Sequence, residues 1–135
     1  MGLFQETARS EDGGGQDQVA ICGFCFGGGV AVRYAQLQPQ FVKACGVFYG
    51  KPISEGAEGL PPVYAVFGGK DSQFPPEMVD DFEVLLKASA VPSEFRRYPG
   101  MGHAFVRDVA AVKEEGSEAK DAWEGWLSFC GSSPQ

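Results

Sequence analysis

The pentapeptide Gly23-Phe24-Cys25-Phe26-Gly27 places a cysteine between two glycines, with one residue on either side. A nucleophile elbow has this form, because a sharp turn from strand to helix exposes its central side chain and small neighbours let the two elements pass closely. The dipole of the following helix stabilises a thiolate there, and the Phe26 backbone N–H is a candidate oxyanion donor. The pattern indicates a nucleophilic Cys25, or alternatively a glycine-rich turn carrying a buried cysteine.

Two residues further along the chain are of the types that such a nucleophile needs. Asp71 follows the apolar run 63–67, and His103, the one histidine of the chain, follows the run 94–98. By itself Asp71 would more often be a helix cap or turn residue, and His103 a loop residue. The order nucleophile, acid, histidine is that of α/β-hydrolases, and the carboxyl ends of parallel strands meet at one edge of a sheet. The three residues therefore predict a Cys25-His103-Asp71 catalytic triad.

Short apolar runs alternate with helical patterns along the chain, and glycine or proline follows each run. This alternation predicts an α/β fold of about four mostly parallel strands with helices on both faces. Ala119, Trp123, Trp126 and Leu127 are spaced to form the apolar stripe of the last helix. Residues 1–17 are polar and predict a flexible leader before one domain over 18–135. The expected strands are 19–22, 44–49, 63–67 and 94–98, and the expected helices are 26–38, one that Pro75-Pro76-Glu77 opens, and 113–129.

The composition argues against several classes of function. A net charge of -7 and the lack of a Lys/Arg cluster disfavour nucleic acid and anionic membranes as partners. No apolar run is long enough to span a bilayer and the first residues do not form a signal peptide, which together favour a cytoplasmic protein. Four irregularly spaced cysteines and one histidine indicate neither a disulfide scaffold nor a zinc site. We expect no metal and no organic cofactor.

From about residue 19 to 129 the chain resembles the C-terminal half of dienelactone hydrolases (carboxymethylenebutenolidases). The resemblance lies in Gly23-Phe24-Cys25-Phe26-Gly27-Gly28, Asp71, His103, Val47-Phe48-Tyr49-Gly50 and Ala122-Trp123. It implies a truncated α/β-hydrolase that cleaves small lactones or esters through an acyl-enzyme. Cys25 would attack the carbonyl, Asp71 would orient His103, and His103 would carry the proton. Arg107, four residues after the histidine, would bind a substrate carboxylate, although a solvated surface charge is an equal alternative for it.

The chain also departs from that family. Few residues precede the first expected strand, so the family's second oxyanion donor, its activating glutamate and another carboxylate-binding arginine are not identified in this sequence. The strand before Cys25 would then have a free edge, which we expect a second copy or a partner chain to cover. One alternative is therefore an inactive half-hydrolase that serves as a binding module.

A second alternative is a thiol-disulfide oxidoreductase built on Cys22-Gly23-Phe24-Cys25. The glycines at 27–29 are poor for the helix that such a motif requires, and the motif assigns no role to Asp71 or His103. The elbow interpretation uses all of these residues and makes Cys22 a buried strand residue. We therefore favour the hydrolase.

Overall fold

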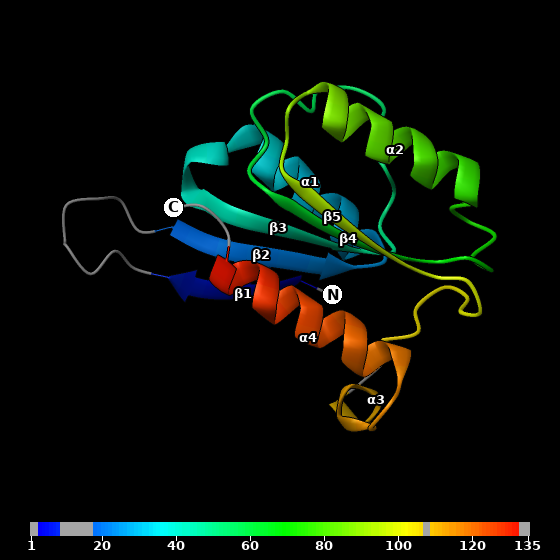
Figure 1. Cartoon of the computed structure of the whole chain (residues 1–135). Helices are drawn as coiled ribbons and strands as arrows, with labels where there is room; N and C mark the ends of the chain where they lie inside the picture. Colours follow the sequence, from blue (N-terminus) through cyan, green and yellow to red (C-terminus); the bar gives the residue numbers. More distant parts are fainter. Residues whose placement is uncertain (1–2, 9–17, 107–108, 133–135) are drawn as a thin grey trace.

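Five strands form one sheet in the computed structural model, which describes residues 3–8, 18–106 and 109–132 (Figure 1). Their order across the sheet follows their order in the chain. β2 to β5 run parallel, and β1 is antiparallel to β2. The prediction of four parallel strands is confirmed, with one antiparallel strand added. The strands are β1 Leu3–Ala8, β2 Gln18–Phe24, β3 Val42–Phe48, β4 Val63–Gly68 and β5 Ser93–Tyr98.

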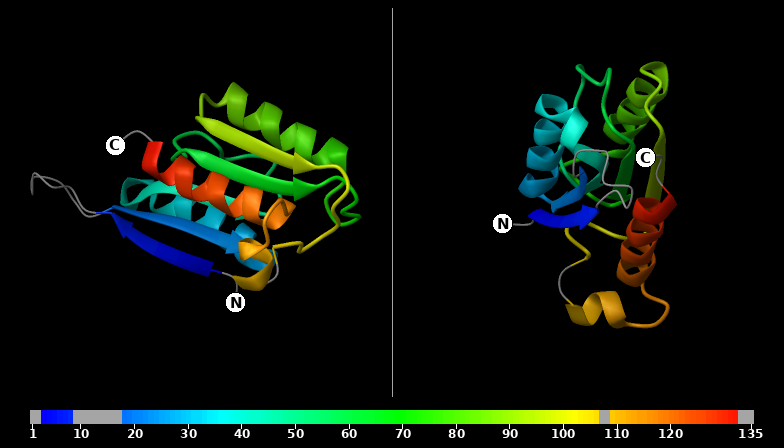
Figure 2. Two further views of the ribbon diagram at one scale, coloured as in Figure 1. Left: turned by 60° about the horizontal axis from the view of Figure 1, so that its bottom comes forward. Right: turned by 90° about the vertical axis from the view of Figure 1, so that its left-hand side faces the viewer.

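Helices cover both faces of this sheet, as Figures 1 and 2 show. The signals that open α2 are local: Pro76 stands at its first position, where no backbone N–H is needed, and Glu77 lies in its first turn. α4 starts later than predicted, because the short helix α3 and a turn occupy residues 109–117. The helices are α1 Phe26–Leu37, η1 Pro39–Phe41, α2 Pro76–Ala88, α3 Val109–Lys113 and α4 Glu118–Ser132.

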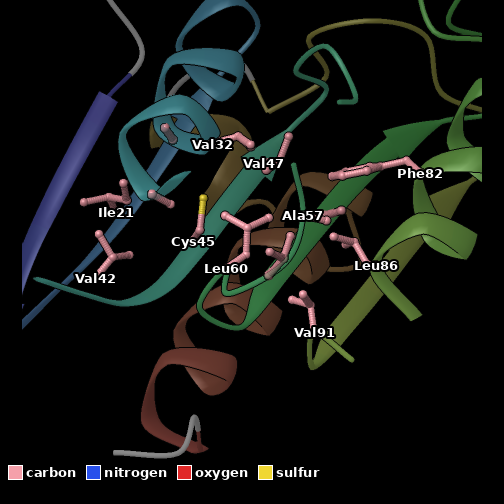
Figure 3. Close-up of a cluster of buried hydrophobic side chains, with 14 of the residues drawn as sticks. Ile21, Val32, Val42, Cys45, Val47, Ala57, Leu60, Phe82, Leu86 and Val91 are labelled. Atoms are coloured by element: carbon pink, nitrogen blue, oxygen red, sulfur yellow. The ribbon is translucent and has the colours of Figure 1, made fainter. Parts of the chain in front are cut away.

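On one face of the sheet, α1, α2 and the loop between β3 and β4 enclose an apolar core (Figure 3). Alternate residues of the central strands point into it, such as Cys45 and Val47, which are fully buried. From the helices come Val32, Phe82 and Leu86, which lie among them. β3 and β4 are buried along nearly their whole length, as expected of strands covered on both sides.

On the other face, α4 packs through Ala119, Ala122, Trp126 and Cys130. The predicted stripe is confirmed for Ala119 and Trp126, which are buried, and for Trp123, which packs partly buried against the same core. The prediction is wrong for Leu127, since 43% of it is exposed. The side chains at 119, 122, 126 and 130 follow one line of the helix at three- and four-residue spacing, and Leu127 lies beside that line. The buried Tyr64 hydroxyl fixes α4 to the sheet by donating to the Ala122 carbonyl at 2.7 Å.

The predicted leader is wrong for residues 3–8, which form β1 and pair with β2 from Leu3 opposite Gly23 to Ala8 opposite Gln18. The rest of that segment, residues 1–2 and 9–17, lies outside the described residues. The predicted free edge at β2 is also wrong, because β1 covers it (Figure 1). Backbone groups at a strand edge pair with any extended segment, whatever its side chains, so the sequence pattern carried little sign of this pairing. Among the described helices, none is long and apolar enough to cross a bilayer.

Candidate active site

Cys25 lies between the end of β2 and the start of α1, at the carboxyl edge of the parallel strands. Its backbone has φ 57° and ψ −124°, a conformation that a non-glycine residue rarely adopts. Two backbone hydrogen bonds hold it there: the Cys25 N–H donates to the Phe48 carbonyl at 3.0 Å, and the Gly28 N–H donates to the Cys25 carbonyl at 2.9 Å. The strained turn expected of a nucleophile elbow is therefore present.

Gly23 is what allows this turn to close. A Cβ at position 23 would lie 2.0 Å from the Gly27 carbonyl oxygen, which is backbone and has no room to move away. By contrast, a Cβ at Gly29, which lies in α1 like Gly27, would have no neighbour within 4 Å. Substitution by alanine is therefore expected to change the free energy of unfolding in opposite directions at these two positions.

Gly23→Ala is expected to lower the free energy of unfolding by on the order of 3 kcal/mol, as overpacking against backbone does. Gly29→Ala should instead raise it by up to about 1 kcal/mol, because alanine is the better helix former. Urea unfolding of the two variants and the wild type measures both. Equal stability of the two variants would show that the elbow does not depend on the close approach at Gly23.

Asp71 and His103 are in direct contact. The His103 Nδ1–H donates to the Asp71 Oδ2 at 2.6 Å, and the aspartate side chain is fully buried whereas 23% of the histidine side chain is exposed. The other carboxylate oxygen, Oδ1, accepts backbone N–H groups from Gln73 at 2.8 Å and Phe74 at 3.4 Å. Asp71 is therefore held from both sides and fixes the orientation of the imidazole.

The loops that carry these two residues are packed backbone to backbone. The Lys70 N–H donates to the Met101 carbonyl at 2.9 Å, and a Cβ at Gly68 would lie 2.3 Å from that carbonyl oxygen. The glycines that mark the end of β4 in the sequence thus let the aspartate loop approach the histidine loop. This closeness makes the 2.6 Å contact between Asp71 and His103 attainable.

The charge of Asp71 also acts on Cys25. Burial and then the Asp71 carboxylate raise the pKa of the Cys25 thiol above its ordinary value. The direction of this shift is opposite to the one expected from the α1 dipole alone, and it disfavours the thiolate. A nucleophilic Cys25 therefore needs a base at the moment of attack.

Sequence reasoning did not find two aromatic residues that flank His103. The Tyr49 ring lies 5.2 Å from the imidazole centroid and the Phe74 ring lies 5.8 Å from it. Cys25 packs against the core cluster that contains Tyr49. Burial and then the negative charge of a Cys25 thiolate raise the pKa of the Tyr49 phenol above its ordinary value. The sequence signals for Tyr49 were its position at a strand end, just before Gly50, and its place in the motif that carries the family resemblance.

The remaining predicted site residues differ in how the structure places them. Phe26 is the first residue of α1, where a backbone N–H has no acceptor within the helix, and 84% of the residue is exposed. Arg107 lies outside the described residues. Cys22 is buried in β2 against the core beneath α4, and no disulfide joins any of the four cysteines. Within the described part of the chain, no group of three or more His, Cys, Asp or Glu residues could hold a metal ion.

A sequence profile of the dienelactone hydrolase family matches residues 5–133. A Yersinia pestis protein described as a putative carboxymethylenebutenolidase is 35% identical over 89% of this chain and 49% of its own length. A Rhodococcus opacus carboxymethylenebutenolidase is 27% identical over 84% of this chain and 50% of its own.

The likeness extends to solved structures. The crystal structure of a putative dienelactone hydrolase from Klebsiella pneumoniae matches with a TM-score of 0.70 and 33% identity, over 82% of this chain and 50% of that one. The chain thus spans about half the length of the relatives that it matches. The region that the family profile matches, residues 5–133, includes the elbow, the Asp71 loop and the His103 loop. The chain belongs to the dienelactone hydrolase family.

Proposed function

We propose that the chain hydrolyses small lactones or carboxylic esters, with Cys25 as nucleophile, His103 as base and Asp71 as the residue that orients the histidine. The observation that carries the proposal is the 2.6 Å hydrogen bond from His103 to the buried Asp71 at the same sheet edge as the Cys25 elbow. Membership of the dienelactone hydrolase family supports the choice of reaction.

The first half of the proposed reaction forms an acyl-enzyme. With its Nδ1–H donated to Asp71, the imidazole presents Nε2 as the base that takes the Cys25 proton. The thiolate attacks the carbonyl carbon, and the Phe26 N–H stabilises the oxyanion. The oxyanion then collapses, the ester C–O bond breaks, and the alkoxide leaves with the proton from His103. A thioester on Cys25 remains.

Water completes the second half. His103 Nε2 removes a proton from water as it attacks the thioester carbonyl, the C–S bond breaks, and the proton returns to the Cys25 sulfur. One ester and one water thus give one acid and one alcohol, and a lactone gives a single hydroxy acid. Arg107 stays a proposed partner for a substrate carboxylate, because a guanidinium can bind both carboxylate oxygens.

The exposed face of α1 bears on whether the chain can work alone. Phe26, Tyr34 and Leu37 lie along one side of this helix with 84%, 42% and 58% of each residue exposed. The stripe starts beside Cys25, and the chain spans about half of its relatives. We propose that a polypeptide equivalent to the rest of those relatives covers this stripe and supplies the second oxyanion donor. If no such partner restores activity, the second candidate function is a non-catalytic binding module.

The proposed function is tested by hydrolysis of a small chromogenic ester and a dienelactone. The chain is assayed alone and after co-expression with the part of the Yersinia pestis relative outside the matched region. Removing one oxyanion donor costs about two to three decades in rate, so we expect slow turnover alone and faster turnover by the pair. No turnover by either folded preparation would contradict the proposal. Disulfide exchange that depends on dithiothreitol would favour the oxidoreductase instead.

A further inference from the structure

Tyr49 connects the end of β3 to the segment that carries His103. Its side chain is 1% exposed, and its hydroxyl donates to the Val106 carbonyl at 3.0 Å. Its ring packs against the rings of His103 and Phe105, with centroids 5.2 and 5.7 Å away. One side chain therefore contacts the histidine itself and also holds the backbone three residues beyond it.

Among the described residues, few other hydrogen bonds hold the segment that carries His103, although Phe105 packs against Tyr98 and Phe74 packs against His103. Up to Met101 it is bonded to neighbouring backbone, through Met101 N–H to the Tyr98 carbonyl at 3.0 Å and Lys70 N–H to the Met101 carbonyl at 2.9 Å. For residues 102–106, the hydrogen bonds made with other described residues are the one from His103 to Asp71 and the one from Tyr49 to Val106. These two hydrogen bonds, with the ring contacts of His103 to Tyr49 and Phe74, fix the position of the imidazole.

The backbone of Tyr49 is itself in an unusual conformation. Its φ is 44°, in the left-handed region that aromatic residues seldom adopt, and its N–H donates to the Val66 carbonyl at 2.7 Å. Four non-glycine residues among those described have positive φ, and three of them are Cys25, Tyr49 and Ala104, the residue after His103. Such conformations persist where the surrounding structure fixes them, and they gather at functional sites.

We propose that Tyr49 is a positioning residue, whose hydroxyl anchors the 103–106 segment and whose ring fixes the face of the His103 imidazole. The role of Tyr49 in turnover rests on the proposed hydrolase function, whereas its effect on His103 does not. Tyr49 acts through His103 and contacts no reacting atom in this account. The expected loss on its removal is therefore in the rate of the chemical step and not in substrate binding.

The chain offers a matched control for this role. Tyr64 is as deeply buried as Tyr49, and its hydroxyl likewise donates to a backbone carbonyl, that of Ala122, at 2.7 Å. Its ring neighbours are Phe48, Trp126 and Phe129, none of which belongs to the proposed triad. Tyr49→Phe and Tyr64→Phe each keep the ring and remove one buried hydrogen bond, so they should lose similar stability. Tyr49→Phe removes the hydrogen bond to the segment that carries His103, whereas Tyr64→Phe removes one to α4.

Two readouts follow on the full chain. Because His103 is the one histidine, the imidazole Cε1–Hε1 resonance reports on it alone by NMR. Tyr49→Phe should shift or split that resonance and Tyr64→Phe should leave it unchanged. In ester hydrolysis, Tyr49→Phe should lower kcat by about tenfold or more with little change in KM, as displaced catalytic groups do. Tyr64→Phe should leave both kcat and KM unchanged.

The proposal is overturned if Tyr49→Phe, folded as judged by its unfolding transition, leaves the His103 resonance where it is in the wild type. Equal effects of Tyr49→Phe and Tyr64→Phe on the resonance would also overturn it, because they would show a general loss of packing. If the wild type hydrolyses no ester, the proposed function fails but the NMR comparison still decides the role of Tyr49. If the wild type does turn over, an unchanged kcat in Tyr49→Phe contradicts the proposal.

Discussion

Cys25→Ala should abolish ester hydrolysis, with a loss of about 10⁴-fold or more, as when the nucleophile of a catalytic triad is removed. The physical reason is that no other thiol can replace it, because Cys22, Cys45 and Cys130 are buried and Cys25 is the one cysteine that is partly accessible to solvent. The fold should be unaffected, since the elbow is held by backbone hydrogen bonds and not by the sulfur. Steady-state hydrolysis by equal amounts of folded variant and wild type measures the loss.

Cys22→Ala is the matched control for this prediction. Cys22 lies in the core beneath α4 and is 1% exposed, so its sulfur has no access to a substrate. A hydrolase that uses the elbow should keep its activity in Cys22→Ala, whereas a Cys22-Cys25 redox pair would lose function with either cysteine. If Cys22→Ala and Cys25→Ala, each shown to be folded, both lose thiol-disulfide exchange, the result would count against the hydrolase and for the redox pair.

Asp71→Asn should have opposite effects on two reactions of the same protein. Hydrolysis should fall by roughly 10³- to 10⁴-fold, because asparagine can hold the His103 ring in place but favours the tautomer that is not a base at Nε2. Alkylation of Cys25 by iodoacetamide at neutral pH should become faster. The Asp71 carboxylate raises the pKa of Cys25, so removing its charge lowers that pKa and increases the thiolate fraction.

The pH dependence of the alkylation rate tests whether Asp71→Asn acts through the pKa of Cys25. In the wild type, the alkylation rate should still be rising with pH at the ordinary thiol pKa, because the pKa of Cys25 lies above it. In Asp71→Asn the same profile should move to lower pH. Asp80→Asn is the control, since Asp80 is an exposed residue of α2 that pairs with Arg97 of β5 and not with a residue of the proposed triad. Full hydrolysis by Asp71→Asn would remove Asp71 from the triad.

Much of this site could be predicted from the sequence because its signals are local. The glycines around Cys25 are required by the turn itself, and Asp71 and His103 each follow a strand that ends in glycine or proline. The topology of a parallel sheet then places these loops at one edge. The Asp71-His103 contact follows from that placement and from the close packing of the two loops.

What the sequence could not give depends on contacts between distant segments. β1 pairs through its backbone, which leaves no side-chain pattern to read. Tyr49 acquires its place only when β3 and the segment after β5 lie side by side, 57 residues apart in the chain. The direction of the Cys25 pKa shift depends on burial and on a carboxylate from another loop. An expectation based on the helix dipole alone therefore had the opposite sign.

Whether Cys25 is the nucleophile is tested most directly by the intact mass of the protein during turnover of a slowly hydrolysed ester. A Cys25 nucleophile predicts that the protein gains the mass of one acyl group, that peptide mapping places this group on Cys25, and that it is absent in Cys25→Ala. Hydrolysis without an adduct on Cys25, or with the acyl group on another residue, would show that Cys25 is not the nucleophile.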